Sequence, residues 1–412
     1  MICRSCKSEK VTQILSLGDQ YLSDFRTDSE KPKKYPLDLM FCRDCFFVQL
    51  KESAPLHEMY TPRYGFKSGV NTTIRNDLHN IVVNALEYLP MPEVEQIDNG
   101  ETLETRPVVM DIGANDGTLL SNYPKSFFRI GIEPIEKLAR ECMRHANNIV
   151  NNFFNYEQVS KALEGMKADI ITSISMFYDV EDPDRFVSEV KKCLSENGVW
   201  IIQQNYLLAT IQENAVDNIC HEHIGYHSLL SMEKLLSRHD LDIVDVSTST
   251  INGGAFRIAV QHKGVGKIKP SVQKQRNIEL ICGLDTTRSY QDFADRVWNN
   301  AAELRKCIQT ITDDGRKVFI YGASTRGGTI WQMAGLDVKL IPCAVDRNPE
   351  KVGKKIASIG VPIISEEEAR MIRPDFMLVS IWFFKDEILE REKEYLAKGG
   401  HLIFPLPHLE II

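Results

Sequence analysis

Four cysteines near the start of the chain have the spacing of metal ligands. Cys3 and Cys6 form one Cys-x-x-Cys pair, and Cys42 and Cys45 form a second. Each pair presents two thiolates at a distance that a tetrahedral ion accepts, so the pattern predicts a zinc site filled by protein ligands. Such a zinc ion is structural and activates no water. The 35 residues between the pairs exceed the usual spacing of zinc ribbons, which leaves four free thiols as the alternative.

A second segment that could carry chemistry is the loop Asp111–Gly117, with the sequence D-I-G-A-N-D-G after an apolar stretch. Gly113 and Gly117 allow the backbone to approach a ligand closely. Glu133 ends the next apolar stretch about 20 residues later, where Rossmann-like sites place a carboxylate on ribose hydroxyls. A nicotinamide dinucleotide fits less well, because G-x-G-x-x-G is absent and the two aspartates of the loop repel a pyrophosphate. A cationic sulfonium cofactor tolerates them, and a domain without cofactor is the remaining alternative.

The densest group of titratable residues is Cys220–His227, with three histidines and one glutamate in the sequence C-H-E-H-I-G-Y-H. His and Glu are ordinary metal ligands, but the H-E-x-x-H spacing of zinc proteases is absent. A solvated polar turn is a second interpretation. A third is acid–base chemistry, in which a histidine oriented by a carboxylate moves a proton near neutral pH. Spacing alone leaves these alternatives open.

Composition restricts the class of protein. The 412 residues are 43% apolar and 26% charged, which is typical of folded globular domains. The 49 basic against 57 acidic residues give a net charge of −8, so a nucleic-acid binder with a general basic surface is not expected. No segment reaches the ~20 apolar residues that span a bilayer, and the N-terminus lacks the apolar core of a signal peptide. We therefore expect a cytoplasmic protein without membrane partners. The sequence is compatible with a monomer and does not determine the oligomeric state.

The elements that position these groups divide the chain into three parts. Residues 1–85 form the expected zinc-binding domain. In residues 86–268, apolar strands alternate with amphipathic helices, which predicts a parallel, doubly wound sheet. Residues 269–412 contain a second strand–glycine–helix unit that begins at Lys317–Ser324. The expected fold class is α/β: an N-terminal zinc-binding module, a central Rossmann-like sheet and a second Rossmann-like α/β domain.

The loop Asp111–Gly117 resembles the first motif of class I S-adenosylmethionine-dependent methyltransferases. The chain as a whole resembles the sugar C-methyltransferases that act on nucleotide-linked keto-deoxysugars. The matching pieces are the four cysteines, Tyr64–Gly69, Asp111–Gly117, Ile219–His223, Asn252–Arg257, Tyr321–Gly327 and Asp346–Pro349. Their shared order across three domains makes the resemblance specific.

The resemblance implies methyl transfer from S-adenosylmethionine to the carbon beside a ketone, commonly carbon 3 of a 4-keto sugar. It assigns proton abstraction to His223, with Glu222 beside it and Tyr226 as a further catalytic candidate. The residues expected at the cofactor are Asp111, Gly113, Asn115, Asp116, Gly117, Glu133 and Ser175. Those expected at the substrate are Tyr64, Asp179, His227, Arg326 and Lys351, with the C-terminal domain holding the nucleotide end.

Three positions depart from the family pattern. Asp179 stands where relatives often carry histidine, Cys220 where tyrosine is common, and Gly328 where asparagine is found. The sugar, its nucleotide and its stereochemistry are therefore left open, and Asp179 is an alternative to His223 as the base. An O- or N-methyltransferase and a catalytically silent sugar-nucleotide binder are the alternative functions.

Overall fold

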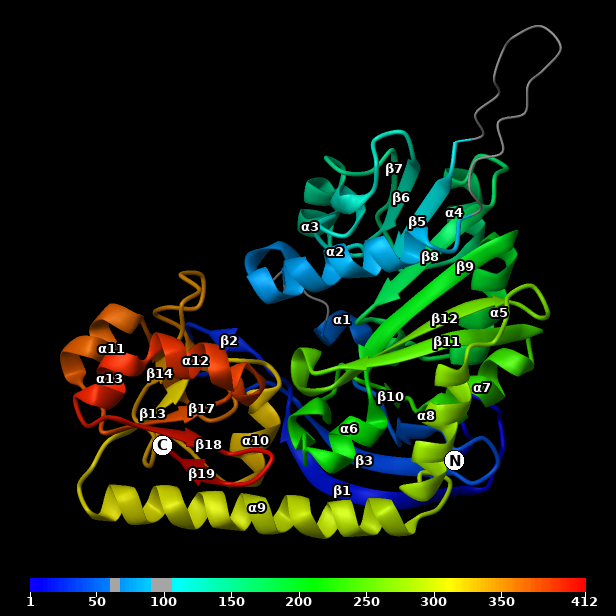
Figure 1. Cartoon of the computed structure of the whole chain (residues 1–412). Coiled ribbons are helices and arrows are strands. Elements are labelled where there is room, and N and C mark those ends of the chain that lie inside the picture. The colour runs from blue at the N-terminus through cyan, green and yellow to red at the C-terminus, as the bar shows by residue number, and fades with distance from the viewer. Residues whose placement is uncertain (60–66, 90–105) are drawn as a thin grey trace, which may run out of the picture.

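The computed structural model describes residues 1–59, 67–89 and 106–412, which form three β-sheets with helices around them (Figure 1). The expected α/β class is confirmed. Tyr64, a predicted substrate residue, lies outside the described residues. Among the described helices, none is both long and apolar enough to cross a membrane.

The N-terminal sheet is antiparallel and has four strands in the order β1-β3-β4-β10. These are β1 (Val11–Tyr21), β3 (Lys34–Cys42), β4 (Val48–Leu50) and β10 (Gly225–Tyr226). The last strand comes from the middle of the chain, directly after the His-Glu-His sequence. It pairs with Val48 and Gln49, so the N-terminal sheet holds one end of that sequence in place.

The central sheet has seven strands in the order β11-β12-β9-β8-β5-β6-β7, of which the last five are parallel. They are β11 (Leu241–Ser249), β12 (Ala255–His262), β9 (Leu194–Asn205), β8 (Ala168–Ile174), β5 (Val108–Ile112), β6 (Phe128–Ile132) and β7 (Asn148–Val150). The helices of this segment are α2 (Thr72–Leu86), α3 (Glu136–Cys142), α4 (Tyr156–Ala162), α5 (Pro183–Cys193), α6 (Leu207–Gln212) and α7 (Leu229–Ser237). Parallel strands place their carboxyl ends at one edge, where such sheets bind ligands.

The C-terminal sheet has eight strands in the order β19-β18-β17-β13-β14-β16-β15-β2. They are β19 (Glu410–Ile411), β18 (His401–Phe404), β17 (Phe376–Val379), β13 (Val318–Tyr321), β14 (Ala344–Val345), β16 (Val361–Ile364), β15 (Lys355–Ile356) and β2 (Phe25–Arg26). Its helices are α10 (Gly327–Met333), α11 (Glu366–Ile372), α12 (Lys385–Arg391) and α13 (Lys393–Ala397). Strand β2 belongs to the N-terminal segment, so the first and last parts of the chain share a sheet.

The three sheets pack as one unit. Helix α9 (Arg288–Asp313) runs along the molecule in Figure 1 and contacts β1, α6 and β13, while α8 (Pro270–Ile281) covers β11. One apolar cluster contains Phe41 of the N-terminal sheet, Trp200 of the central sheet and Trp331 of α10, each at most 1% exposed. Fully burying side chains of this size contributes about 2–3 kcal/mol each, so the segments stabilise one another.

The four N-terminal cysteines converge as the spacing predicts. Their sulfur atoms all lie within 4.8 Å of one another, and Sγ of Cys3 is 3.6 Å from Sγ of Cys45. The two pairs form matching turns: Lys7 and Phe46, directly after each pair, have positive φ and donate their N–H to the carbonyls of Cys3 and Cys42. Hydrogen bonds from Cys3 and Cys45 lower the pKa of the Cys42 thiol. This compact set of thiols fits a tetrahedral zinc ion.

We expect purified protein to contain one zinc ion per chain by elemental analysis. Cys42→Ser should lose most of this zinc and lower the free energy of unfolding by about 4 kcal/mol or more, because metal binding is coupled to folding. Cys343→Ser, at a half-buried thiol of the C-terminal segment, is the matched control and should retain the metal. Zinc-free wild-type protein with four titratable native thiols would contradict the assignment.

Candidate active site: two adjoining cavities

The first cavity, called here the loop cavity, has a volume of about 450 Å³ at the carboxyl edge of the central sheet. Asp111 comes from the end of β5, Glu133 follows β6 and Ser175 follows β8. These strands are neighbours in the sheet, and for that reason residues far apart in sequence meet here. Of the predicted cofactor residues, those that line it are Asp111, Gly113, Asn115, Glu133 and Ser175.

The loop after β5 needs glycine at one position in particular. Gly113 has φ +80°, and a Cβ there would lie 3.0 Å from Cγ of Met176. The N–H groups of Gly113 and Ala114 both donate to the carbonyl of Ile132, each at 2.9 Å. These hydrogen bonds hold the backbone over the end of β6. At Gly113 the wall of the loop cavity therefore consists of backbone alone.

Two carboxylates at the bottom of the loop cavity are held by hydrogen bonds. The two oxygens of Glu133 accept the N–H groups of Asn115 at 2.9 Å and of Ile135 at 2.8 Å. Burial raises the pKa of Glu133. Burial also raises the pKa of Asp111 to about 7, although its carboxylate accepts the hydroxyl of Thr172 at 2.6 Å. Both groups would be stabilised in their charged form by a cation in the cavity.

The lining of the loop cavity fits S-adenosylmethionine. Asp77, Asp111, Glu133, Asp179, Glu181, Asp182 and Glu189 supply seven carboxylates, against one arginine, Arg185. Four of the seven are paired with a basic side chain: Asp77 with Arg257, Glu181 with Arg4, Asp182 with Lys7 and Glu189 with Arg185. Asp111 and Glu133, at the carboxyl edge of the sheet, favour a sulfonium over the pyrophosphate of a dinucleotide. Phe153, 45% exposed, adds an aromatic face on which an adenine ring can stack.

Asp116 and Gly117, also predicted at the cofactor, are not among the described residues that line either cavity. The carboxylate of Asp116 accepts the N–H of Gly69 at 2.9 Å and the hydroxyl of Thr118 at 2.6 Å. A Cβ at Gly117 would lie 2.9 Å from Cα of Cys142. These two residues therefore shape the loop and its packing rather than line a cavity.

The second cavity, called the histidine cavity, has a volume of about 680 Å³ and is lined by all three segments of the chain. The N-terminal segment contributes Ser23–Arg26 and Lys33, the central segment Cys220, Glu222 and His223, and the C-terminal segment Ser324–Arg326, Lys351 and Phe383. The two cavities have four lining residues in common: Ile74, Ser175, Asp179 and Asn252. Ligands in the two cavities would therefore lie against each other.

The three histidines of Cys220–His227 have different environments. His221 bonds through Nε2 to the carbonyl of Tyr35 in β3, at 3.0 Å. His227 is 2% exposed and packs between the rings of Phe47 and Phe177, where burial lowers its pKa to about 3. Among these three, only His223 lines a cavity. Tyr226, a predicted catalytic residue, is buried in β10 and, like His227, lines neither cavity.

His223 is oriented by two contacts. Its Nδ1 lies 2.8 Å from the carbonyl of Asn218, and its ring packs on Tyr178 at 4.2 Å between centroids. A carbonyl only accepts hydrogen bonds, so Nδ1 carries the proton and the lone pair of the neutral ring is on Nε2. Burial, followed by the positive charge of Arg326, lowers the pKa of His223 to about 3. The imidazole is therefore neutral at physiological pH.

The two predicted substrate cations line the histidine cavity but have protein partners. Arg326 donates to the fully buried Asp217 at 2.6 Å and to the carbonyl of Asn252 at 2.8 Å. Lys351 donates to the carbonyl of Ala323 at 2.7 Å and lies 3.2 Å from Asp346. Part of the hydrogen-bonding capacity of each cation is already used.

Sequence reasoning missed several residues that shape the site. Asn218 orients His223, Asp217 holds Arg326, and Phe153 follows a strand of only three residues, β7. None of them stands in a pattern that signals chemistry. Asn252 was part of a matched motif, but its position at the junction of the two cavities depends on the packing of the segments.

Comparisons with known proteins agree with this architecture. Three family models match in order: a zinc-binding domain over residues 3–60, a methyltransferase domain over residues 87–246 and a C-methyltransferase C-terminal domain over residues 250–407. The C-methyltransferase NovU of Streptomyces niveus is 26% identical over 417 residues, which cover 100% of this chain and 96% of that protein.

Solved structures are similar to part of the chain. A S-adenosylmethionine-dependent methyltransferase from Clostridium acetobutylicum ATCC 824 is 13% identical with a TM-score of 0.34, covering 47% of this chain and 93% of the other. Magnesium protoporphyrin IX methyltransferase from Synechocystis PCC 6803, with bound S-adenosylmethionine, is 13% identical with a TM-score of 0.34, covering 48% and 88%.

The matched models together follow the chain from its zinc-binding cysteines to its last strands, and the NovU similarity spans its whole length. The cysteine cluster fits the structural zinc of the first model, and the loop cavity fits the cofactor of the second. The chain thus joins a zinc-binding domain, a methyltransferase domain and a C-methyltransferase C-terminal domain, and it is an S-adenosylmethionine-dependent C-methyltransferase.

Proposed function

We propose that this enzyme methylates the carbon beside the ketone, carbon 3, of a nucleotide-linked 4-keto-deoxysugar. One observation carries the proposal: the loop cavity and the histidine cavity share Ile74, Ser175, Asp179 and Asn252, and the histidine cavity is lined by His223. Direct methyl transfer to carbon requires a carbanion and a methyl donor at close range. The shared wall places the methyl donor next to the acceptor carbon, and His223 is the proposed base.

The cofactor is assigned to the loop cavity. S-adenosylmethionine supplies an electrophilic methyl group on a positively charged sulfur. Each oxygen of Glu133 accepts one backbone N–H and keeps a further lone pair for a ribose hydroxyl. Asp111 and the other carboxylates of the lining stabilise the positive charge.

Proton abstraction is assigned to Nε2 of His223. The C–H bond beside the ketone breaks, the proton goes to Nε2, and the electron pair is delocalised into the enolate before it forms the new C–C bond. The ring is neutral at physiological pH, so the lone pair of Nε2 is available. Burial and the charge of Arg326 lower its pKa to about 3, however, and this disfavours the imidazolium that proton abstraction forms. Glu222 and Asp179 line the same cavity, so their carboxylates are the groups that would offset the charge of Arg326 when the imidazolium forms.

The nucleotide end is assigned to the part of the histidine cavity formed by the first and last segments. Phe383 and Phe384 provide aromatic surface for a base. Lys31 adds a basic side chain from the N-terminal segment, where Arg26 and Lys33 are paired with Glu30 and Glu58. Arg326 and Lys351 of the C-terminal segment line the same cavity, and Nζ of Lys351 lies 4.8 Å from the ring centroid of Phe25. A sugar diphosphate could thus be bound between domains, with its ketone toward His223.

Replacing Glu133 by Ala should weaken S-adenosylhomocysteine binding by on the order of 1.5–3 kcal/mol, since a charge-assisted contact to the ribose is lost. Isothermal titration calorimetry measures this directly. Glu136→Ala removes a carboxylate that is 68% exposed on α3 and serves as the matched control with unchanged affinity. Equal affinities for wild type and Glu133→Ala, in protein of normal melting temperature, would contradict the placement of the cofactor in the loop cavity with its ribose on Glu133.

The proposed reaction predicts hydrogen exchange without methyl transfer. In D₂O, with S-adenosylhomocysteine in place of the methyl donor, wild-type enzyme should exchange the hydrogen on carbon 3 of a nucleotide-linked 4-keto-deoxysugar. His223→Ala should slow this exchange by ~10²–10⁴-fold, the usual contribution of a general base, without loss of S-adenosylhomocysteine affinity. Mass spectrometry and NMR of the recovered sugar measure the exchange.

The control for this experiment is His408→Ala, at an exposed histidine near the C-terminus, which should exchange at the wild-type rate. Asp179→Asn tests the alternative base. Near-normal exchange in His223→Ala together with none in Asp179→Asn would transfer the role to Asp179.

A further inference from the structure

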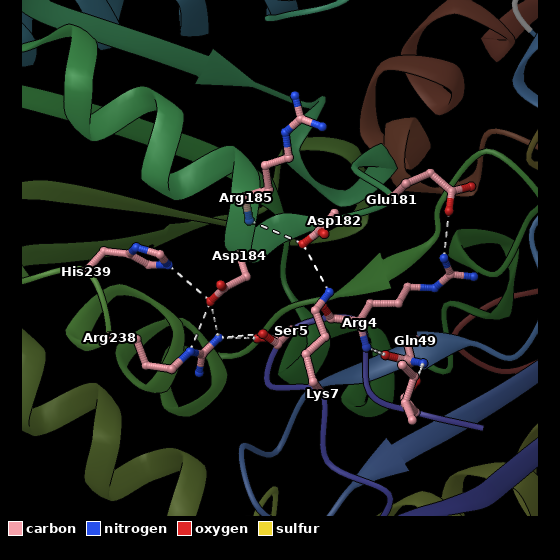
Figure 2. A network of polar contacts seen from close by, with 11 residues as sticks. Arg4, Ser5, Lys7, Gln49, Glu181, Asp182, Asp184, Arg185, Arg238 and His239 are labelled. Atoms are coloured by element: carbon pink, nitrogen blue, oxygen red, sulfur yellow. Dashed lines mark hydrogen bonds and ion pairs between the residues drawn. The ribbon is translucent and has the colours of Figure 1, made fainter. Parts of the chain in front are cut away.

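The first cysteine turn makes polar contacts well outside the zinc-binding segment (Figure 2). Nη1 of Arg4, which lies between Cys3 and Cys6, donates to Oε2 of Glu181 at 2.7 Å. The other carboxylate oxygen of Glu181 accepts the hydroxyl of Ser53 at 2.6 Å. Directly after the turn, Nζ of Lys7 lies 3.2 Å from Asp182. Two consecutive carboxylates of the central domain are therefore held by the N-terminal domain.

These carboxylates belong to the wall of the loop cavity. Glu181, Asp182 and Arg185 all line it. Asp182 is also the N-cap of α5, where its side chain accepts the N–H of Arg185 at 3.2 Å. A displacement of residues 181–182 would therefore move both the cavity wall and the first turn of α5.

A second set of contacts fixes the same helix end. Arg238 donates through Nη2 to the carbonyl of Ser5 at 2.7 Å and to its hydroxyl at 3.0 Å. Its Nε donates to Asp184 in the first turn of α5 at 3.1 Å, and His239 contacts the same carboxylate at 3.0 Å. Ser5 is 2% exposed, so this link is enclosed by protein. Figure 2 shows the two sets of contacts side by side.

The second cysteine turn offers a natural comparison. Arg43 occupies the position after Cys42 that Arg4 occupies after Cys3. Its Nε donates to the hydroxyl of Thr12 at 3.1 Å, and the neighbouring Asp44 bonds to Ser8 and Lys10. These contacts stay within the N-terminal segment. In the described residues, the two equivalent arginines thus differ in the domain that they contact.

We propose that Arg4 is a positioning residue for the methyl donor: through Glu181, the first zinc turn holds the wall of the loop cavity in its binding position. The metal fixes the conformation of Cys3–Cys6. The ion pair between Arg4 and Glu181 then restricts the movement of the residues that precede α5. The zinc-binding domain then contributes to cofactor affinity without contacting the cofactor. The inference rests on the placement of S-adenosylmethionine in the loop cavity.

The test compares Arg4→Ala with Arg43→Ala in the full-length protein. Both variants remove an arginine from the same position of a cysteine turn. We expect Arg4→Ala to keep its zinc and to raise the dissociation constant of S-adenosylhomocysteine about three- to ten-fold, the size expected for a charge pair within a network. Arg43→Ala should bind as wild type does, and Arg4→Lys, which keeps the charge, should recover most of the affinity.

A double-mutant cycle with Glu181→Gln separates positioning from direct contact. If Arg4 acts through Glu181, the dissociation constant of the double variant should be no higher than that of the single variant that binds more weakly. Independent effects would instead multiply the two increases in the dissociation constant. Ser53→Ala removes the hydroxyl that Glu181 accepts and leaves both the zinc turn and the cavity lining intact, so it tests the link if Arg4→Ala fails to fold. Unchanged affinity in zinc-loaded Arg4→Ala, equal losses in Arg4→Ala and Arg43→Ala, or multiplying effects would overturn the proposal. Failure of the cofactor placement itself would appear separately, as wild-type affinity in Glu133→Ala.

Discussion

The active site depends on one buried ion pair between domains. Asp217 is fully buried and accepts Nη2 of Arg326 at 2.6 Å, and the same guanidinium donates to the carbonyl of Asn252. Removing one partner of such a pair costs about 3–5 kcal/mol, because the other charge stays buried without compensation. Asp217 and Asn218 lie in the same short turn, and the carbonyl of Asn218 orients His223. A cation of the C-terminal domain therefore fixes the turn that holds the proposed base.

Contacts from both neighbouring domains position the His-Glu-His sequence of the central domain. Thr329 of α10, in the C-terminal domain, donates at 2.7 Å to the carbonyl of Ile219, which precedes the His-Glu-His sequence. On the other side, β10 pairs with β4 of the N-terminal sheet. The central domain supplies the histidine, and its two neighbours determine where it points. Among the described residues, the lining of the loop cavity is mainly acidic, whereas the histidine cavity carries five basic side chains beside five acidic ones.

Patterns within a short stretch of sequence predicted much of this structure. The two Cys-x-x-Cys pairs, the glycine loop after β5 and the alternation of strands and helices each depend on neighbouring residues, and they appear as expected. Contacts across domains could not be predicted. Strands β2 and β10 have two residues each, too few to show a period, yet each joins the sheet of another segment. Arg326 has the character of a phosphate ligand in sequence, but its partner Asp217 stands 109 residues away.

The most direct test of the account is the structure of the methylated product. Purified zinc-loaded enzyme, S-adenosylmethionine and a panel of nucleotide-linked keto-deoxysugars can be analysed by mass spectrometry and NMR. We predict that a 4-keto-deoxysugar nucleotide gains one methyl group, on carbon 3, through a new C–C bond. Methyl transfer to oxygen or nitrogen, or methylation confined to acceptors without a ketone beside the reacting carbon, would contradict it.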